Sequence, residues 1–436
     1  MKQSNRLILF LIGVFAETQV NVIGFIGISE LFIFLVAPFF FITDYSQLKR
    51  HGFHVFLWLD ILMFVSGWFS GFANHIPLRD IMRGVATPYA IFAITVVFHR
   101  YLSRNLNDVK WLLFGLAISI TLCTFVFQQG NTIVSGGEVL SREEAAAAAQ
   151  EYSLFWLQQA NAWLTLPVKI AYLRLPLWVP LGISGFLFIL GFFYSNSRSM
   201  LATTVITLFM LFVGGRAQQK MLFVKKHFFA IATCLLILAP AGNVFYRYCA
   251  TTGMLGEAAR NKYYIQTKGK KGIMAVIMGG RSEFFVGLKA CIDQPLIGQG
   301  SWARDYKGFV GEFLTKYGDD SDYRSYANWL SVGRIPLIPS HSYIITFWLW
   351  YGIGGLIFGF YLGWVYIRTF KNYLSAIPFL YGYFCFVLPG TILAWLFSPF
   401  GHRVGSTLTM VLCLFARAVA RNTMFVPREA KKGLIR

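Results

Sequence analysis

The chain has 436 residues, of which 56% are hydrophobic and only 13% are charged. A soluble domain carries roughly twice that charged fraction, so the composition excludes an ordinary soluble enzyme and predicts a helical membrane protein. The formal charge of +20 does not indicate nucleic-acid binding, because a lysine and arginine excess in cytoplasmic loops produces the same balance.

Apolar runs, most of them long enough to cross a bilayer as a helix, recur along the chain. They predict spans near Leu7–Ala16, Val22–Ile42, Phe53–Ala73, Gly84–Phe98, Trp111–Phe127, Leu177–Tyr194, Met200–Gly214, Phe228–Phe245, Ser342–Ile367, Ala376–Phe397 and Val404–Ala420. One more span, between Gln150 and Tyr172, is predicted because the basic stretch from Arg216 to Lys226 then lies in the cytoplasm.

These spans predict an all-α polytopic membrane protein with about 12 transmembrane helices and both termini inside. Residues 1–247 would hold spans 1–9, and residues 248–340 would form one large outer loop containing short helices. Residues 341–436 would hold spans 10–12 and a basic cytoplasmic tail, which suits contact with anionic lipid.

The six cysteines show no paired spacing of the kind that binds metal. Cys249 and Cys291 both lie in the large loop, and the sequence leaves open whether they form a disulfide. No cluster of histidine, cysteine and aspartate has metal-ligand spacing, so neither a catalytic metal nor a cofactor is expected.

The short outer loops carry arginine as their only cation, at Arg79, Arg83, Arg142, Arg198 and Arg403. A guanidinium group binds phosphate oxygens in a bidentate way, so an outer surface of arginines suits a phosphate-bearing lipid. The alternative is that these side chains reach the phosphates of ordinary phospholipids.

Arg281 opens the segment GGRSEFFVGLKACIDQPLIGQG in the large loop. Apolar residues at helical spacing follow it and predict an amphipathic helix of about three turns, namely Phe284, Phe285, Leu288 and Ile292. An arginine near a helix start favours an anion, since free backbone N–H groups point the same way. The alternative is a helix on the membrane surface whose Arg281 pairs with Glu283 or a lipid.

His341 follows Pro336, Pro339 and Ser340, which predict an extended approach, and it opens a long aromatic span. Histidine titrates near neutrality, so this side chain is a candidate general base. A structural histidine is the alternative.

Three stretches resemble the O-antigen ligase and Wzy-type polymerase superfamily: SNSRSMLA around Arg198, GGRSEFFVGLKACIDQPLIGQG from Arg281, and SHSYIITFWLWYGIGG around His341. The resemblance implies a GT-C-like fold in the bacterial inner membrane, with the large loop and the active face in the periplasm. It also implies metal-independent, inverting transfer of a glycan from undecaprenyl pyrophosphate to a sugar hydroxyl of a glycan or glycolipid.

By the same resemblance, Arg198 and Arg281 would bind the donor pyrophosphate and His341 would take the acceptor proton. Arg260 and Arg403 are further candidates for substrate binding. Ser342 stands where the family commonly has asparagine, and the Arg-x10-Gly signature of many polymerases is absent at Arg198, Arg260 and Arg281. These differences favour a ligase, whose acceptor would be lipid A-core or similar, over a Wzy-type O-antigen or exopolysaccharide polymerase.

Two other classes of function stay open. A transporter or lipid-glycan flippase would carry internal repeats and charged groups near the bilayer centre, whereas the ionisable groups singled out above lie at span ends and in the loop. A membrane-anchored assembly factor would use the loop only to bind partners.

Overall fold

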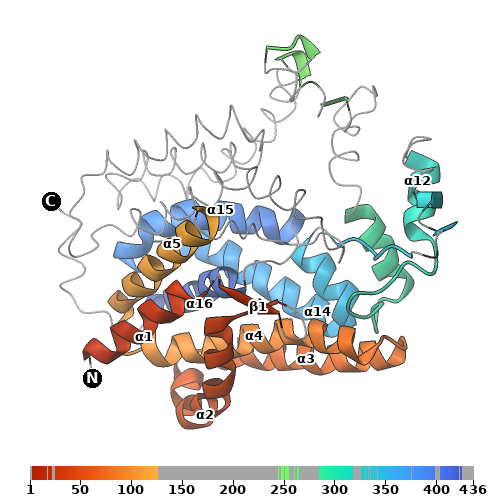
Figure 1. Cartoon of the computed structure of the whole chain (residues 1–436). Coiled ribbons are helices and arrows are strands. Elements are labelled where there is room, and N and C mark those ends of the chain that lie inside the picture. Colours follow the sequence, from red (N-terminus) through yellow and green to blue (C-terminus); the bar gives the residue numbers. More distant parts are fainter. Residues whose placement is uncertain are drawn as a thin grey trace.

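The computed structural model describes residues 2–16, 18–21, 25–125, 284–317, 335–340, 342–374, 376–397, 403–421 and 423–424, with short pieces at 244, 247–249, 251–254, 260, 263–264, 326–328, 330–331 and 333. These residues are mostly helical, and Figure 1 shows the long helices gathered in one bundle with α12 at its edge. The predicted all-α class is confirmed at this level, with one small two-stranded sheet added.

The chain enters the bundle through a helix and a hairpin. The elements are α1 (Lys2–Val14), β1 (Gln19–Asn21), β2 (Phe25–Gly27) and α2 (Ile28–Arg50). The strands pair antiparallel, with Gln19 opposite Gly27. The Glu30 carboxylate accepts a hydrogen bond from the Gly27 backbone N–H at 3.0 Å, which fixes the start of α2. The predicted span Val22–Ile42 therefore begins too early, because Phe25–Gly27 form β2 and α2 begins only at Ile28.

Three longer helices follow: α3 (His54–Ala73), α4 (Leu78–Leu102) and, after the short 3-10 helix η1 (Leu106–Asp108), α5 (Val109–Phe125). Pro77 precedes α4, and its carbonyl accepts the backbone N–H of Asp80 at 2.8 Å. The helix therefore begins well before the predicted Gly84. Arg79 and Arg83, predicted in an outer loop, lie on the first turns of α4 instead.

The last part of the chain adds the remaining elements. Residues 284–293 are helical and are followed by α12 (Phe309–Tyr317), α14 (Tyr343–Arg368), η3 (Thr369–Tyr373), η4 (Pro378–Leu380), α15 (Tyr381–Phe397) and α16 (Arg403–Ala420). The predicted ends of the last three spans agree with these bounds to within a few residues, apart from the later start of α15.

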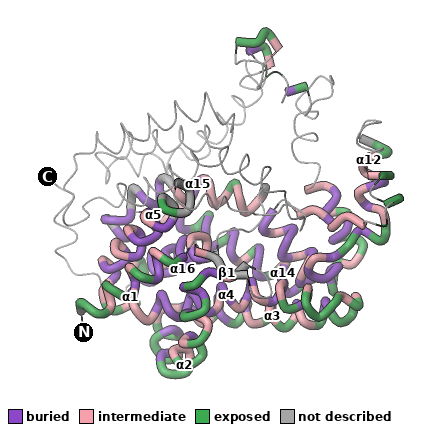
Figure 2. Tube along the Cα trace, in the orientation of Figure 1, coloured by how far each residue is buried: buried purple, intermediate pink, exposed green. Residues whose placement is uncertain are grey.

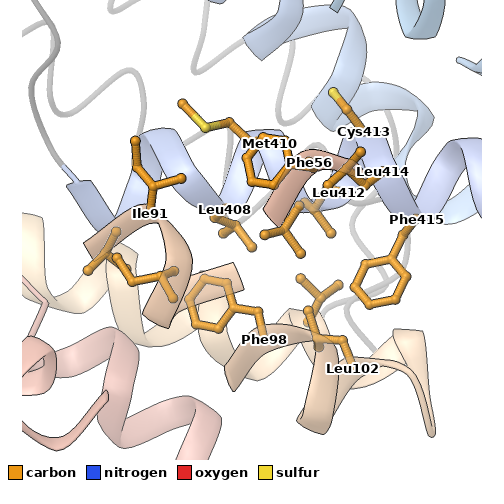
Figure 3. Packing of buried hydrophobic residues seen from close by; sticks show 14 of the residues in the cluster. Phe56, Ile91, Phe98, Leu102, Leu408, Met410, Leu412, Cys413, Leu414 and Phe415 are labelled. Atoms are coloured by element: carbon orange, nitrogen blue, oxygen red, sulfur yellow. The ribbon is translucent and has the colours of Figure 1, made fainter. Parts of the chain in front are cut away.

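The centre of the bundle is an apolar cluster shared by α3, α4, α14 and α16. Figure 3 shows Phe98 and Leu102 of α4 facing Leu408, Leu412 and Phe415 of α16. The rings of Phe53 and Phe415 lie 5.0 Å apart, edge to face. Lipid is as apolar as these side chains, so close packing rather than escape from water holds such helices together.

Within the described residues, four helical stretches are long and apolar enough to cross a membrane: Ile28–Arg50, His54–Ala73, Leu78–Leu102 and Tyr343–Tyr373. Leu35 and Ile42 of α2 are 81% and 77% exposed, and Figure 2 shows exposed residues along the outward sides of α2 and α3. Such an apolar surface would be an aggregation liability in water, and it suits contact with lipid.

Ion pairs hold the end of the bundle where α2 and α4 finish. Arg100 of α4 binds the buried Asp44 of α2 at 2.5 Å, and Arg6 of α1 binds Asp108 at 3.0 Å. Nearby, Nδ1 of His51 lies 2.9 Å from Nε2 of His99. The charge distribution predicts that Arg6 and Arg100 face the cytoplasm, so we call this the inner end.

The opposite end, where α3 finishes and α4 begins, contacts residues 295–302; we call it the loop end. Here α14 is not one straight helix. Gly352 has φ 57° and ψ −143°, and the chain folds back at this point. The rings of Phe347 and Phe358 lie 5.5 Å apart, whereas eleven residues of straight helix would separate them by about 16 Å. The predicted single span Ser342–Ile367 is therefore wrong in form: it consists of a short segment 343–351 packed back on a longer one.

Candidate functional site

The predicted site residues fall mostly outside the described part of the chain. Arg198, Arg281 and His341 lie outside the described residues, as does the predicted span between Gln150 and Tyr172. Arg260 is described as helical and exposed, and Arg403 is the first residue of α16. The segments on either side of His341, and the helix that follows Arg281, are described, and they pack together at the loop end.

The turn at residues 295–300 fills the break in α14. The backbone N–H of Gln299 donates to the Leu349 carbonyl at 2.7 Å, and that of Ile353 donates to the Leu296 carbonyl at 2.9 Å. These bonds satisfy backbone groups that the broken helix leaves free, as a break at membrane depth requires. A Cβ on Gly298 would lie 2.7 Å from the Leu349 carbonyl oxygen, so the two backbones touch directly.

The loop helix at residues 284–293 packs on the first segment of α14. Val286, Ala290 and Cys291 face Ile345 and Leu349, whose side chains are buried with them. The predicted helix is confirmed over its described length, and Phe284 and Leu288 of its predicted apolar face pack against this cluster, although Val286, Ala290 and Cys291 are more deeply buried. Ile292, also predicted on that face, is 62% exposed, because the side of the helix that meets the α14 segment is centred on Ala290 and Cys291 instead.

The same helix supports the approach to His341. A Cβ on Gly287 would lie 2.7 Å from the Pro339 carbonyl oxygen, so helix and approach are in backbone contact. On its other side the approach pairs with the chain after the turn. The N–H of Ile338 donates to the Ala303 carbonyl at 3.0 Å, and that of Asp305 donates to the Pro336 carbonyl at 2.8 Å. Backbone pairing, and not the prolines alone, fixes the extended form.

Ser342, directly after His341, is the N-cap of α14. Its hydroxyl accepts the Ile345 N–H at 3.4 Å and donates to the Trp395 carbonyl of α15 at 3.0 Å. The side chain is fully buried. Serine and asparagine are both strong N-cap residues, so serine can supply the capping that asparagine would supply here. The hydroxyl joins the residue beside His341 to another helix of the bundle.

A stack of charged and aromatic side chains lies at the same end. The guanidinium carbon of Arg83 in α4 lies 4.3 Å from the ring centroid of Trp302, and the ring of Trp350 lies 5.3 Å from that of Trp302. The Ser301 hydroxyl donates to the Asp80 carbonyl at 3.0 Å, and the Tyr351 hydroxyl donates to the Gly84 carbonyl at 2.9 Å. These contacts join α4, the loop turn and α14.

The thiols in the loop are not joined. Cys249 and Cys291 are both free and buried, which answers the disulfide question left by the sequence. Burial raises the pKa of the Cys291 thiol, so this side chain is an unreactive part of the packing. Among the described residues no group of three or more histidine, cysteine or acidic side chains is placed to hold a metal ion.

The loop surface carries its own charge pairs. The Lys307 ammonium donates to Asp293 at 2.5 Å and, with a hydrogen bond from Gln299, holds the pKa of that carboxyl below its usual value. Lys289 of the loop helix also forms an ion pair with Glu312 of α12. Asp293 is therefore an ionised partner of lysine and not a proton-transfer group at neutral pH.

Sequence reasoning missed two features. Asp60, within α3, is 1% exposed, and both its carboxylate oxygens lack a hydrogen-bond partner in the described part of the chain. An acid inside an otherwise apolar run is visible in the sequence and could have identified it. Trp302 was also missed, because an aromatic residue after a glycine turn carries no signal of its own.

No known protein family matches this sequence, and no curated protein matches it significantly.

Proposed function

We propose that the protein is a glycosyltransferase of the bacterial inner membrane that works at the periplasmic face. It would move a glycan from undecaprenyl pyrophosphate to a sugar hydroxyl, as O-antigen ligases do, within a GT-C-like bundle of about 12 spans. The observation that carries the proposal is the packing of the loop helix after Arg281 against the approach to His341, through Gly287 and Pro339. A Cβ on Gly287 would also lie 2.8 Å from Cγ2 of Ile345, so two segments that carry the resemblance are in direct contact.

The proposed chemistry needs two kinds of group. Pyrophosphate is a good leaving group whose developing charge must be neutralised, and arginines can do this without a metal. The incoming hydroxyl must lose its proton, which a neutral imidazole can accept. We assign the first role to Arg198 and Arg281, with Arg260 and Arg403 as further substrate-binding candidates, and the second to His341.

The test is direct. Purified protein in lipid nanodiscs is incubated with a polyprenyl-pyrophosphate glycan and either a lipid A-core acceptor or more of the same donor, and the products are identified by mass spectrometry. Glycan joined to lipid A-core identifies a ligase, and lengthened glycan on the polyprenyl carrier identifies the polymerase alternative. If neither product forms, and the reaction mixture with His341→Gln is indistinguishable from that with the natural protein, the transferase proposal is wrong.

A second candidate, a lipid-linked glycan transporter, is favoured by two observations. Transport sites are commonly built from broken helices, and α14 is broken at Gly352. Buried acids in spans often serve transport, and Asp60 is one. Movement of a fluorescent polyprenyl-pyrophosphate glycan across proteoliposomes, abolished by Asp60→Asn, would support transport. Glycan transfer without such movement would support the enzyme.

A further inference from the structure

The stack of Arg83, Trp302 and Trp350 holds its central residue under strain. Trp302 has φ 58°, a left-handed conformation that strains a non-glycine residue. Its neighbours fix it there: Ser301 is bonded to the Asp80 carbonyl, and the Ala303 carbonyl is bonded to Ile338. Strain that the surroundings maintain is typical of functional positions.

The indole N–H of Trp302 is a donor without an acceptor. It is buried and has no hydrogen-bond partner within the residues that the structure describes. By contrast, the indole N–H of Trp348, on the same segment of α14 as Trp350, donates to the Pro295 carbonyl at 2.8 Å. A buried donor without a hydrogen bond is destabilising, and a bound acceptor would remove that cost.

Arg83 also has donors to spare. It bonds Asp80 through one nitrogen at 3.3 Å, a distance typical of a weak ion pair, and its side chain is 32% exposed. The guanidinium group has five N–H donors, and its central carbon lies over the indole ring. The rings of the stack contact one another and the guanidinium group, so they offer no open aromatic face to a sugar. What the cluster can still offer a ligand is N–H hydrogen-bond donors.

We propose that Arg83 and the Trp302 indole N–H form a binding site for the phosphate group of a lipid headgroup, with Trp350 holding the stack in place. A ligand facing only donors must be an acceptor, and a cation beside it selects an anion. Arg83 lies near the start of α4, at the end of a candidate span, where headgroups lie. The phosphate could belong to a polyprenyl pyrophosphate or to bulk phospholipid.

The site is testable without any enzyme assay, so its failure is distinguishable from failure of the proposed transferase. The deuterated protein, with ¹⁵N-labelled indoles, is titrated in neutral detergent with undecaprenyl pyrophosphate, and separately with phosphatidylglycerol. The Trp302 signal is identified by its loss in Trp302→Phe. We expect that signal to move on addition of ligand while the Trp348 signal, already bonded to Pro295, stays in place.

Variants measure the two donors separately. Trp302→Phe keeps a ring for the stack but removes the N–H, and Arg83→Gln removes the cation; each should weaken phosphate-lipid binding about 10-fold or more. Arg304→Gln, an exposed arginine of the same loop, should bind normally. Response to undecaprenyl pyrophosphate alone identifies a carrier-lipid site, and response to both lipids identifies a general phospholipid site. An unmoved Trp302 signal with both lipids, or unchanged binding in both variants, overturns the proposal.

Discussion

The two ends of the bundle are held together by different means. At the inner end, side chains make the contacts: Phe53 packs on Phe415, and Arg100 binds Asp44. At the loop end, direct backbone contacts are added to the side-chain contacts: Gly298 lies against the Leu349 carbonyl, and Gly287 lies against the Pro339 carbonyl. Side-chain contacts can adapt to a substitution of similar volume, whereas a backbone contact has no room for one methyl group.

This difference bears on function. A site that transfers a group needs reacting atoms held within a fraction of an ångström, and backbone contacts give that precision. Under the proposed function, the inner end would need only to keep the helices assembled. Substitutions at the loop end should therefore impair chemistry more than equally conservative ones at the inner end, and the predictions below test this in order of expected effect.

The largest effect is expected at His341. His341→Ala should lower turnover by roughly 10²–10⁴-fold, the usual contribution of a positioned general base. Binding of the donor lipid should stay nearly unchanged, since the pyrophosphate is assigned to Arg198 and Arg281. Initial transfer rates and donor affinity, measured on the same preparation, separate the two. Loss of donor binding as the sole defect would mean that His341 is not the base.

Arg281→Lys should lower transfer roughly 10-fold or more, because lysine keeps the charge but loses the bidentate fork. Arg304→Lys is the matched control, since Arg304 is an exposed arginine of the same loop whose bond goes to a backbone carbonyl. The ratio of the two transfer rates measures how much the guanidinium geometry at position 281 contributes to the rate. Equal rates would show that only charge matters at position 281.

Gly352→Ala should lower the stability of the loop end by about 2–5 kcal/mol, because alanine adds a clash with the Leu296 carbonyl to the strain of a positive φ. Gly308→Ala separates the two costs. Gly308 also has a positive φ, 75°, but nothing lies within 4 Å of its added Cβ, so about 1–2 kcal/mol is expected. Unfolding midpoints in detergent measure both, and equal midpoints would show that the break tolerates a side chain.

The smallest effect concerns the loop thiols. Cys249 and Cys291 are free, so reduction should leave the unfolding midpoint unchanged, and a maleimide should label both only after denaturation. The raised pKa of Cys291 also predicts slow labelling of the folded protein. Mass shifts with and without denaturant are the measurement, and an unlabelled pair that becomes reactive after reduction would reveal a disulfide.

The contrast between the ends also separates what the sequence predicts from what it does not. Hydropathy predicts helices such as α3 and α16 to within a residue, because apolar length alone decides a span. It cannot detect the fold-back at Gly352, since both segments of α14 are equally apolar and only the turn at residues 295–300 makes the break tolerable. It also places Arg83 in a loop, because the helix start depends on Pro77 and not on hydropathy.

The sequence predicts the segments that form the candidate site but not how these segments pack against one another. The glycine turn, the loop helix and the approach to His341 are each visible as local patterns. Their mutual contacts depend on pairing between residues 303–305 and 336–338, which no local pattern specifies. Trp302 becomes a candidate through features that only the fold reveals: its left-handed backbone, its buried indole N–H, and its contact with Arg83, more than two hundred residues earlier in the chain.

The pH dependence of glycan transfer tests the central claim most directly. If neutral His341 accepts the acceptor proton, the rate at saturating donor should rise with pH through the ordinary range of an imidazole, near 6.5, and level off above it. His341→Gln should be slow at every pH and show no such rise. A natural protein whose rate is flat between about pH 5.5 and 8, or a His341→Gln variant that transfers glycan normally, would contradict the account.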